Sequence, residues 1–308
     1  MRNTPLSNLV YFKISQENPE PSLDGFYIFE KRNPDIKKYI DNTKQIKNYL
    51  ITIRMLLDKK EKKDVVDKYF RLLANSLNEF SNCSEFSCFI NACDNVLGFV
   101  KNDLSLLKEI AKRYFKNRIF NEGVPEEWIQ AILDSNSARK KGTCGENKLL
   151  YFLERAGFKR INTWNDFNKC EKCVVRFSEI FNLDAARKNL DINIKTHKQN
   201  KRLDLIIKDK EKIYLLEAKH LNTSGGGQDK QISELIELLS LSEKNKNVSY
   251  ISFLDGNYSN VLLGEGRVMG KLKTQRRDIN KFLKKKPNNY WVNTAGFKKL
   301  LENLKTVF

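Results

Sequence analysis

Several features are scarce in this sequence of 308 residues, and each absence excludes a class of protein. No run of about eighteen apolar residues occurs, so the sequence predicts no membrane-spanning helix and no membrane partner. Residues 1–21 contain no continuous apolar core of the signal-peptide type, and we therefore expect a cytoplasmic protein. No glycine-rich phosphate loop of the Walker type is present, which predicts a function that is independent of ATP.

Histidines and paired cysteines are also few. The two histidines, His197 and His220, do not suffice for a histidine-based metal site or a catalytic triad. The six cysteines are expected to be free thiols, because no signal peptide is predicted. Cys170 and Cys173 have the spacing of zinc ligands, but a structural zinc needs four ligands and no second pair follows. Whether these two thiols bind a metal stays open at this point.

Positive charge, in contrast, is abundant and unevenly distributed. The formal net charge is +18. Residues 1–100 hold 15 Lys/Arg and 13 Asp/Glu, whereas residues 101–308 hold 41 and 25. A general bias towards lysine would raise the charge everywhere, and the nearly neutral first hundred residues argue against it. The excess over residues 101–308 predicts a polyanionic partner such as a nucleic acid.

The first part of the chain has mostly helical patterns. Apolar residues recur at helical spacing in segments 36–53 and 65–77, and a further helix is expected between residues 88 and 120. Residues 1–34 are expected to be irregular, with one short strand at 26–29. We predict a mostly helical N-terminal region over residues 1–125, with a structural role and a possible dimer interface. Glycine, proline and polar residues between 123 and 142 mark the break.

Residues 126–308 alternate between helical and strand patterns, which predicts a second domain of mixed α/β type. Thr143 fits a helix N-cap, with Glu146 as its capping-box partner. Residues 190–196 alternate as a strand does. After a central hairpin, helices are expected at 228–244, 274–286 and 294–304, and strands at 248–254 and 290–292.

The most informative stretch is the predicted hairpin at residues 201–221. Asp204 stands at the head of one apolar run, a charged turn follows at 209–211, and a second apolar run ends in Glu217-Ala218-Lys219. Folding the two strands together places Asp204 beside Glu217, and Lys219 points to the same face as Glu217. Two carboxylates and an ammonium group at one end of a hairpin can bind a divalent metal ion and attack a phosphodiester.

These residues resemble the motif of the PD-(D/E)xK nuclease superfamily, which includes most type II restriction endonucleases. Leu203 stands where the motif has a proline, a position that often varies in the family. The resemblance spans roughly residues 142–255. It implies an α/β (α+β) fold with a restriction-endonuclease-like mixed β-sheet core flanked by helices. It also implies Mg²⁺ bound by Asp204, Glu217 and the backbone oxygen of Ala218, with Lys219 as a further catalytic residue.

Two further site residues follow from the resemblance, each with an alternative. Glu146, on the helix before the hairpin, matches the additional acid of the family and is a candidate metal ligand, or it is only a helix cap. Gln231, on the helix after the hairpin, matches a glutamine that some of these nucleases use, or it is only an exposed polar residue. Contacts with DNA are expected from basic residues near both helices: Arg139, Lys140, Lys141, Lys271, Lys273, Arg276 and Arg277.

We therefore expect a Mg²⁺-dependent type II restriction endonuclease that cuts both strands of double-stranded DNA as a homodimer. Two alternatives remain at this stage. One is a repair, recombination or nicking nuclease of the same fold. The other is a DNA-binding protein without catalysis, although an intact set of Asp204, Glu217 and Lys219 argues against it.

Overall fold

A computed structural model describes residues 6–119, 123–135, 138–194, 203–223 and 225–305. The chain forms two compact units. The first unit combines Met1–Ile28 with Arg139–Phe308, and the second is Phe29–Ala138. The boundary expected near residue 125 therefore falls inside the second unit, and the first 28 residues join the C-terminal part of the chain.

The second unit is helical, as its periodic apolar residues predict. Its α-helices are α2 (Ile36–Asp58), α3 (Lys63–Ser76), α4 (Glu85–Ala92), α5 (Leu97–Val100), α6 (Leu104–Asn117) and α7 (Glu126–Ser135), with the short 3₁₀ helix η1 at Ser81–Cys83. Buried residues such as Leu50, Phe70 and Ile110 share one core. The helix expected from residue 88 to residue 120 is divided into three, and Asp94, in the left-handed conformation at φ 53°, follows the end of α4.

The first unit contains a six-stranded mixed sheet. Its strands are β1 (Lys159–Arg160), β2 (Lys172–Arg176), β3 (Leu205–Asp209), β4 (Lys212–His220), β5 (Val248–Asp255) and β6 (Tyr290–Val292). The strands lie side by side in the order of the sequence. β2, β3 and β4 are antiparallel, whereas β4, β5 and β6 are parallel, and β1 is parallel to β2. The expectation of a mixed α/β domain is confirmed.

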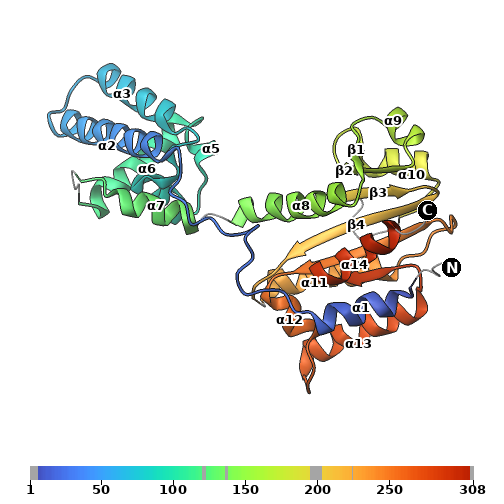
Figure 1. The fold of residues 1–308 in the computed structure, drawn as a ribbon. Coiled ribbons are helices and arrows are strands. Elements are labelled where there is room, and N and C mark those ends of the chain that lie inside the picture. The colour runs from blue at the N-terminus through green and yellow to red at the C-terminus, as the bar shows by residue number, and fades with distance from the viewer. Residues whose placement is uncertain (1–5, 120–122, 136–137, 195–202, 224, 306–308) are drawn as a thin grey trace. The chain divides into compact units, whose positions relative to one another are not determined.

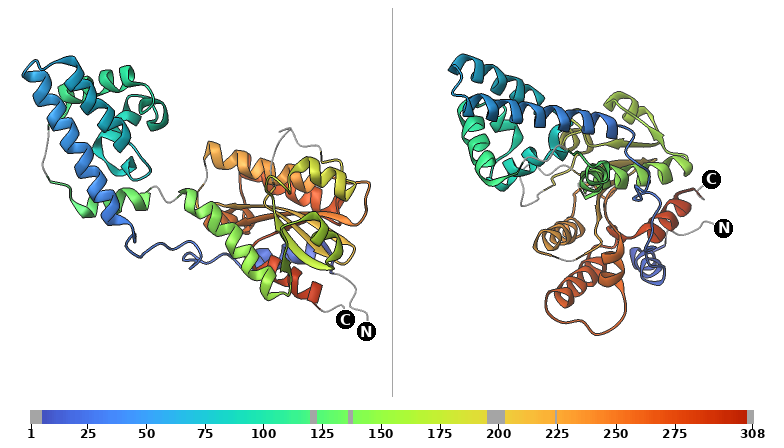
Figure 2. Two further views of the ribbon diagram at one scale, coloured as in Figure 1. Left: turned by 90° about the horizontal axis from the view of Figure 1, so that it is seen from above. Right: turned by 90° about the vertical axis from the view of Figure 1, so that its left-hand side faces the viewer.

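Helices cover both faces of this sheet (Figures 1 and 2). On one face, α8 (Ala138–Arg155) and α14 (Thr294–Lys305) pack against strand residues such as Leu205 and Leu216. On the other face, α9 (Trp164–Lys169), α10 (Leu183–Leu190) and α11 (Gly226–Ser240) bury residues such as Ile206 and Leu215. α12 (Asn257–Leu263) and α13 (Gly270–Lys285) extend this second layer beside α11. Successive residues of a strand point to opposite faces of the sheet, so each strand contributes side chains to both apolar cores.

Helix α1 (Asn8–Glu17) corrects the expectation that residues 1–34 are irregular. The side-chain amide of Asn8 donates hydrogen bonds to the carbonyl groups of Leu283, Lys286 and Asn289 at 2.8, 3.0 and 2.9 Å. The segment 26–29 forms no strand. Contacts with residues far along the sequence hold α1 in place, so local patterns did not reveal it.

Two further expectations about local structure were wrong. Thr143 is not an N-cap, because α8 begins at Ala138, where an alanine, an arginine and two lysines favour a helix more than Gly142 opposes it. Residues 190–194 form no strand, because α10 continues to Leu190 and ends with Asp191 in the left-handed conformation. Residues 195–196 of that expected strand lie outside the described residues.

Candidate active site

The hairpin predicted at residues 201–221 is confirmed as β3 and β4, joined by the two residues Lys210 and Glu211. Lys210 adopts the left-handed conformation, at φ 55°, which tight hairpin turns require. Leu205 pairs with Leu216. Continuing this register by one residue places Asp204 opposite Glu217. The backbone N–H of Asp204 donates to the carbonyl oxygen of Leu216 at 3.0 Å, which fixes that position.

Three predicted site residues come together at this end of the hairpin. Oδ2 of Asp204 accepts a hydrogen bond of 2.6 Å from the backbone N–H of Ala218. The ammonium group of Lys219 donates to Oε1 of Glu217 at 2.5 Å. The Glu217 side chain is 2% exposed, and that of Lys219 is 21% exposed. The two acids and the lysine therefore form one connected group at the margin of the core.

Burial and mutual repulsion set the charge state of this group. Burial, together with the neighbouring charge of Glu217, raises the pKa of Asp204 to about 7. Burial lowers the pKa of Lys219, but the charges of Glu217 and Asp204 outweigh this effect, so its pKa lies above the usual value. Lys219 is therefore a cation at neutral pH. The Asp204 carboxyl group binds a proton more readily than an ordinary aspartate does, as long as no further cation lies beside it.

The donor atoms at this site fit a hard divalent cation. Carboxylate oxygens of Asp204 and Glu217 are the ligands that Mg²⁺ prefers. The pKa of Asp204 is raised because two carboxyl groups lie close together in a poorly solvated place. A divalent cation binds well to the same arrangement of carboxyl groups. Asp204 and Glu217 would hold the ion. The backbone oxygen of Ala218 stays a predicted ligand.

Glu146 lies on α8 near the hairpin. Its charge contributes to the raised pKa of Asp204, so the two carboxylates interact. Its Oε2 forms an ion pair of 3.5 Å with Nε of Arg176 on β2, and the Glu146 side chain is 34% exposed. Because Thr143 lies inside α8, the role of Glu146 as a capping-box partner is excluded. Its role as a metal ligand stays a prediction.

Helix α11 adds an acid that sequence reasoning missed. The charge of Glu234 contributes to the raised pKa of Lys219, which places this carboxylate near the site. Gln231 is half-buried and precedes Glu234 by three residues, so both lie on the same side of α11. The helical spacing from Gln231 was the signal that could have found Glu234.

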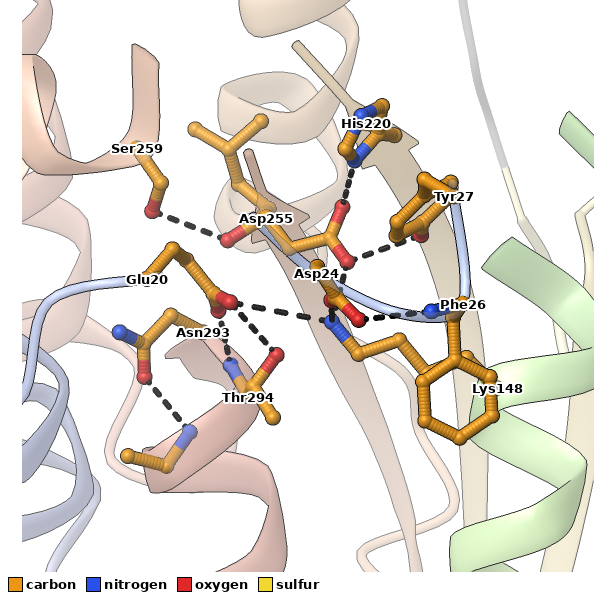
Figure 3. A network of polar contacts seen from close by, with 12 residues as sticks. Glu20, Asp24, Phe26, Tyr27, Lys148, His220, Asp255, Ser259, Asn293 and Thr294 are labelled. Carbon is orange, nitrogen blue, oxygen red and sulfur yellow. Dashed lines mark hydrogen bonds and ion pairs between the residues drawn. The ribbon is translucent and has the colours of Figure 1, made fainter. Parts of the chain in front are cut away.

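A second group of charged residues is buried on the opposite face of β4 (Figure 3). The ammonium group of Lys148 on α8 lies 2.6 Å from Asp24 Oδ2 and 2.7 Å from Asp255 Oδ2, and 3.7 Å from Glu20 Oε2. Nδ1 of His220 lies 2.9 Å from the other Asp255 oxygen. This group, which we call the Lys148 cluster, joins α8, β4, β5 and the segment after α1 directly behind the active-site strand.

Lys148 and Asp255 hold each other in their charged forms. Burial alone would raise the pKa of Asp255, but His220 and Lys148 outweigh it and keep that pKa below its usual value. Burial lowers the pKa of Lys148, but the carboxylates of Asp255 and Glu20 outweigh it and keep that pKa high. Tyr27 completes the cluster, since its ring stacks on His220 at 3.6 Å and its hydroxyl donates to Asp255 at 2.8 Å.

Sequence reasoning missed the Lys148 cluster. Two signals were present: an acid closes the apolar strand that ends at Asp255, and a lysine stands beside the apolar side of α8 at Lys148. Glu20, Asp24 and Asp255 also form the only set of three possible metal-ligating residues among the described residues with ligand atoms within 4.8 Å of one another. The Lys148 ammonium group lies 2.6 to 3.7 Å from an oxygen of each of the three, so a cation of the protein already contacts the whole set.

The cysteine pair does not form a metal site with other described residues. Cys173 is buried in β2, and burial raises the pKa of its thiol to about 12. Cys170 is half-buried, and its thiol donates to the carbonyl oxygen of Lys172 at 3.4 Å. A buried protonated thiol is a poor zinc ligand.

The basic residues expected to contact DNA differ in their surroundings. Lys271 forms an ion pair of 2.9 Å with Asp229, and Arg277 lies 3.3 Å from Asp278. Lys273 is exposed. Arg276 is half-buried and donates to three backbone carbonyl groups. The side chains of Arg139, Lys140 and Lys141 lie outside the described residues.

Comparison with known families gives one result. A family model described as DpnII restriction endonuclease matches residues 28–260. This segment contains the hairpin with Asp204, Glu217 and Lys219, together with Glu146. Neither the curated proteins nor the solved structures gave a match. Among the described helices, none combines the length and the apolar character that crossing a bilayer requires.

Proposed function

Because the chain belongs to the DpnII restriction endonuclease family, a group of site-specific enzymes acting on DNA, we propose that it cleaves both DNA strands in a Mg²⁺-dependent reaction. We assign it to the type II enzymes of the PD-(D/E)xK superfamily. One observation carries this proposal. The hairpin of β3 and β4 joins Asp204, Glu217 and Lys219 in a buried group, inside the segment that the family model matches.

The residues of the site have distinct roles in this reaction. Asp204 and Glu217 would hold the metal ion, with the carbonyl oxygen of Ala218 and the carboxylate of Glu146 as further ligands. When bound, Mg²⁺ supplies positive charge to the phosphate group and makes a coordinated water more acidic. The N–H of Ala218 orients the Asp204 carboxylate towards the site through the hydrogen bond of 2.6 Å.

Lys219 acts as a fixed cation. Glu217 holds its ammonium group at 2.5 Å, and the neighbouring acids raise its pKa, so it is protonated at neutral pH. A protonated lysine cannot accept a proton from water. It orients the attacking water by donating a hydrogen bond, and it neutralises charge that develops on a phosphoryl oxygen.

The distribution of charge supports DNA as the substrate. Residues 101–308, which contain the whole site, hold most of the excess of Lys and Arg. Cleavage of both strands at one position suits a homodimer, in which each copy cuts one strand. The helical unit formed by Phe29–Ala138 is our candidate for the dimer interface. The cytoplasmic location stays a prediction from the sequence.

Incubation with DNA tests the proposal. Plasmid and genomic DNA are treated with the purified protein in Mg²⁺ and, separately, in EDTA. Discrete fragments that appear only with Mg²⁺ support the proposed function. Nicked circles or a continuous smear point to a nicking or unspecific nuclease, and a gel shift without cleavage points to a binding protein. The variant Glu217→Gln, which removes one carboxylate charge, is expected to bind DNA without cutting it.

A further inference from the structure

The loop Gly264–Gly270 between α12 and α13 is built as a rigid turn. The guanidinium group of Arg276 donates to the carbonyl oxygens of Val261, Leu262 and Gly266 at 2.8, 2.9 and 3.0 Å. These bonds hold the last turn of α12 and the first half of the loop on the side of α13. Three donors of one planar guanidinium group leave this part of the loop little freedom.

Three glycines in the loop occupy positions where a side chain would clash or where the backbone conformation disfavours other residues. A Cβ atom on Gly264 would lie 2.7 Å from the carbonyl oxygen of Asn260. Gly266 and Gly270 adopt positive φ angles of 113° and 59°. Between the last two glycines the chain displays Arg267 and Met269 as exposed side chains, whereas Val268 is half-buried.

Two exposed side chains of the loop, Arg267 and Met269, are not engaged by the described part of the protein. Arg267 is exposed, and within the described part of the chain it forms no hydrogen bond or ion pair. Met269 is 88% exposed, an unusual position for a long apolar side chain on a firmly anchored loop. A cation next to an apolar, adaptable side chain matches the mixed surface of a DNA groove, where base edges lie between phosphates.

The helix before the loop, α12, starts at the end of the sheet that carries the candidate active site. β4 and β5 are parallel, so Lys219 and Asp255 lie at the same edge, and α12 begins two residues after Asp255. From the other end of the loop, Lys271 binds Asp229 at 2.9 Å, in the first turn of the helix that follows β4. Figure 1 shows the loop projecting from the corner of α12 and α13.

We propose that the loop Gly264–Gly270 enters a groove of the DNA substrate and takes part in sequence recognition. Arg267 donates to base edges, and Met269 packs against bases. The inference rests on the proposed function, because it assigns a recognition element to that nuclease. In this proposal Arg276 does not contact DNA, because its guanidinium group anchors the loop. If the loop contacted only phosphate groups, Arg267 would bind them, but Met269 would stay exposed to solvent.

Three variants of the full chain test the loop, namely Arg267→Ala, Arg267→Lys and Met269→Ala, and Lys285→Ala is a control. Lys285 is an exposed cation at the other end of α13. An exposed leucine in the same unit, Leu23, which is 80% exposed, gives the matched apolar control Leu23→Ala. The measurements are the cleavage rate on genomic DNA with Mg²⁺, the sequences at the cut ends, and thermal unfolding.

If the loop reads DNA, Arg267→Ala and Met269→Ala cut about 10- to 100-fold more slowly and at a wider set of sequences, with unchanged unfolding. Arg267→Lys does not restore the wild-type rate, because lysine cannot form the paired hydrogen bonds of arginine. Both control variants cut as the wild type does.

Two results would overturn the assignment while leaving the nuclease intact: unchanged rates and cut ends in Arg267→Ala, or full activity in Arg267→Lys, which indicates a phosphate contact. A wild-type protein that does not cut DNA with Mg²⁺ would overturn the proposed function, and the loop assignment with it.

Discussion

Replacing Asp204 by asparagine is expected to stabilise the metal-free protein while it abolishes cleavage. The pKa of Asp204 rises from 3.8 to about 7 through burial and the charge of Glu217. Asparagine has nearly the same shape and carries no charge. Its amide oxygen can accept the hydrogen bond from Ala218, and its amide group can donate to Glu217. The variant therefore removes the repulsion and keeps the geometry.

The direction of the effect with pH follows from proton binding. Between pH 3.8 and about 7, the folded protein binds the Asp204 proton more tightly than the unfolded chain does. Rising pH in this window therefore lowers the stability of the wild type. A pKa difference of about three units corresponds to about 4 kcal/mol as an upper value. We expect asparagine to recover about 2 to 4 kcal/mol at pH 8, or roughly 5 to 10 °C in melting temperature.

Thermal unfolding in EDTA at pH 5, 6, 7 and 8 measures this effect. The melting temperature of Asp204→Asn should exceed that of the wild type by an amount that grows with pH up to about 7. Added Mg²⁺ should stabilise the wild type more than the variant. Asp184→Asn is the control, since Asp184 is 87% exposed and its effect should not grow with pH. A variant that melts at or below the wild-type temperature at pH 8 refutes the reasoning.

Three further predictions concern single residues. Lys219→Met should lower the cleavage rate by about 100-fold or more and leave DNA binding in gel shifts intact, and a rate within tenfold of wild type would remove Lys219 from the reaction. Lys148→Met should destabilise the protein by about 3 to 5 kcal/mol in chemical unfolding, because Asp255 and Glu20 lose their buried partner, and the control Lys285→Met should have little effect. Thr143→Ala should change the free energy of unfolding by less than about 0.5 kcal/mol, since Thr143 lies inside α8, whereas a loss of about 1 kcal/mol would indicate an N-cap after all.

The hairpin was predictable because its information is local. Two apolar runs and a charged turn fix the register, and the register alone brings Asp204 to Glu217. The helices of the second unit were visible for the same reason, through their regular spacing. The beginning of α8 was misplaced because the sequence offers two cap signals. Ser137 directly precedes Ala138, but Thr143 and Glu146 have the spacing of a capping box and predict a later start.

Other parts of the structure depend on contacts between distant residues. Lys148 meets Asp24 and Asp255 across more than a hundred positions of the sequence, and no local pattern indicates such a partner. The same holds for the anchoring role of Arg276, which from the sequence alone looks like any other exposed arginine of a basic helix. Local patterns therefore predicted the candidate site, whereas the contacts of Lys148 and Arg276 became visible only in three dimensions.

The position of α1 has a consequence for the order in which the enzyme becomes active during its synthesis. α1 is synthesised before the C-terminal residues that it contacts, since Asn8 finds its partners only at Leu283, Lys286 and Asn289. The helical unit Phe29–Ala138 lies between them in the sequence and has a core of its own. A nascent chain can therefore carry a folded helical unit long before its nuclease unit is complete.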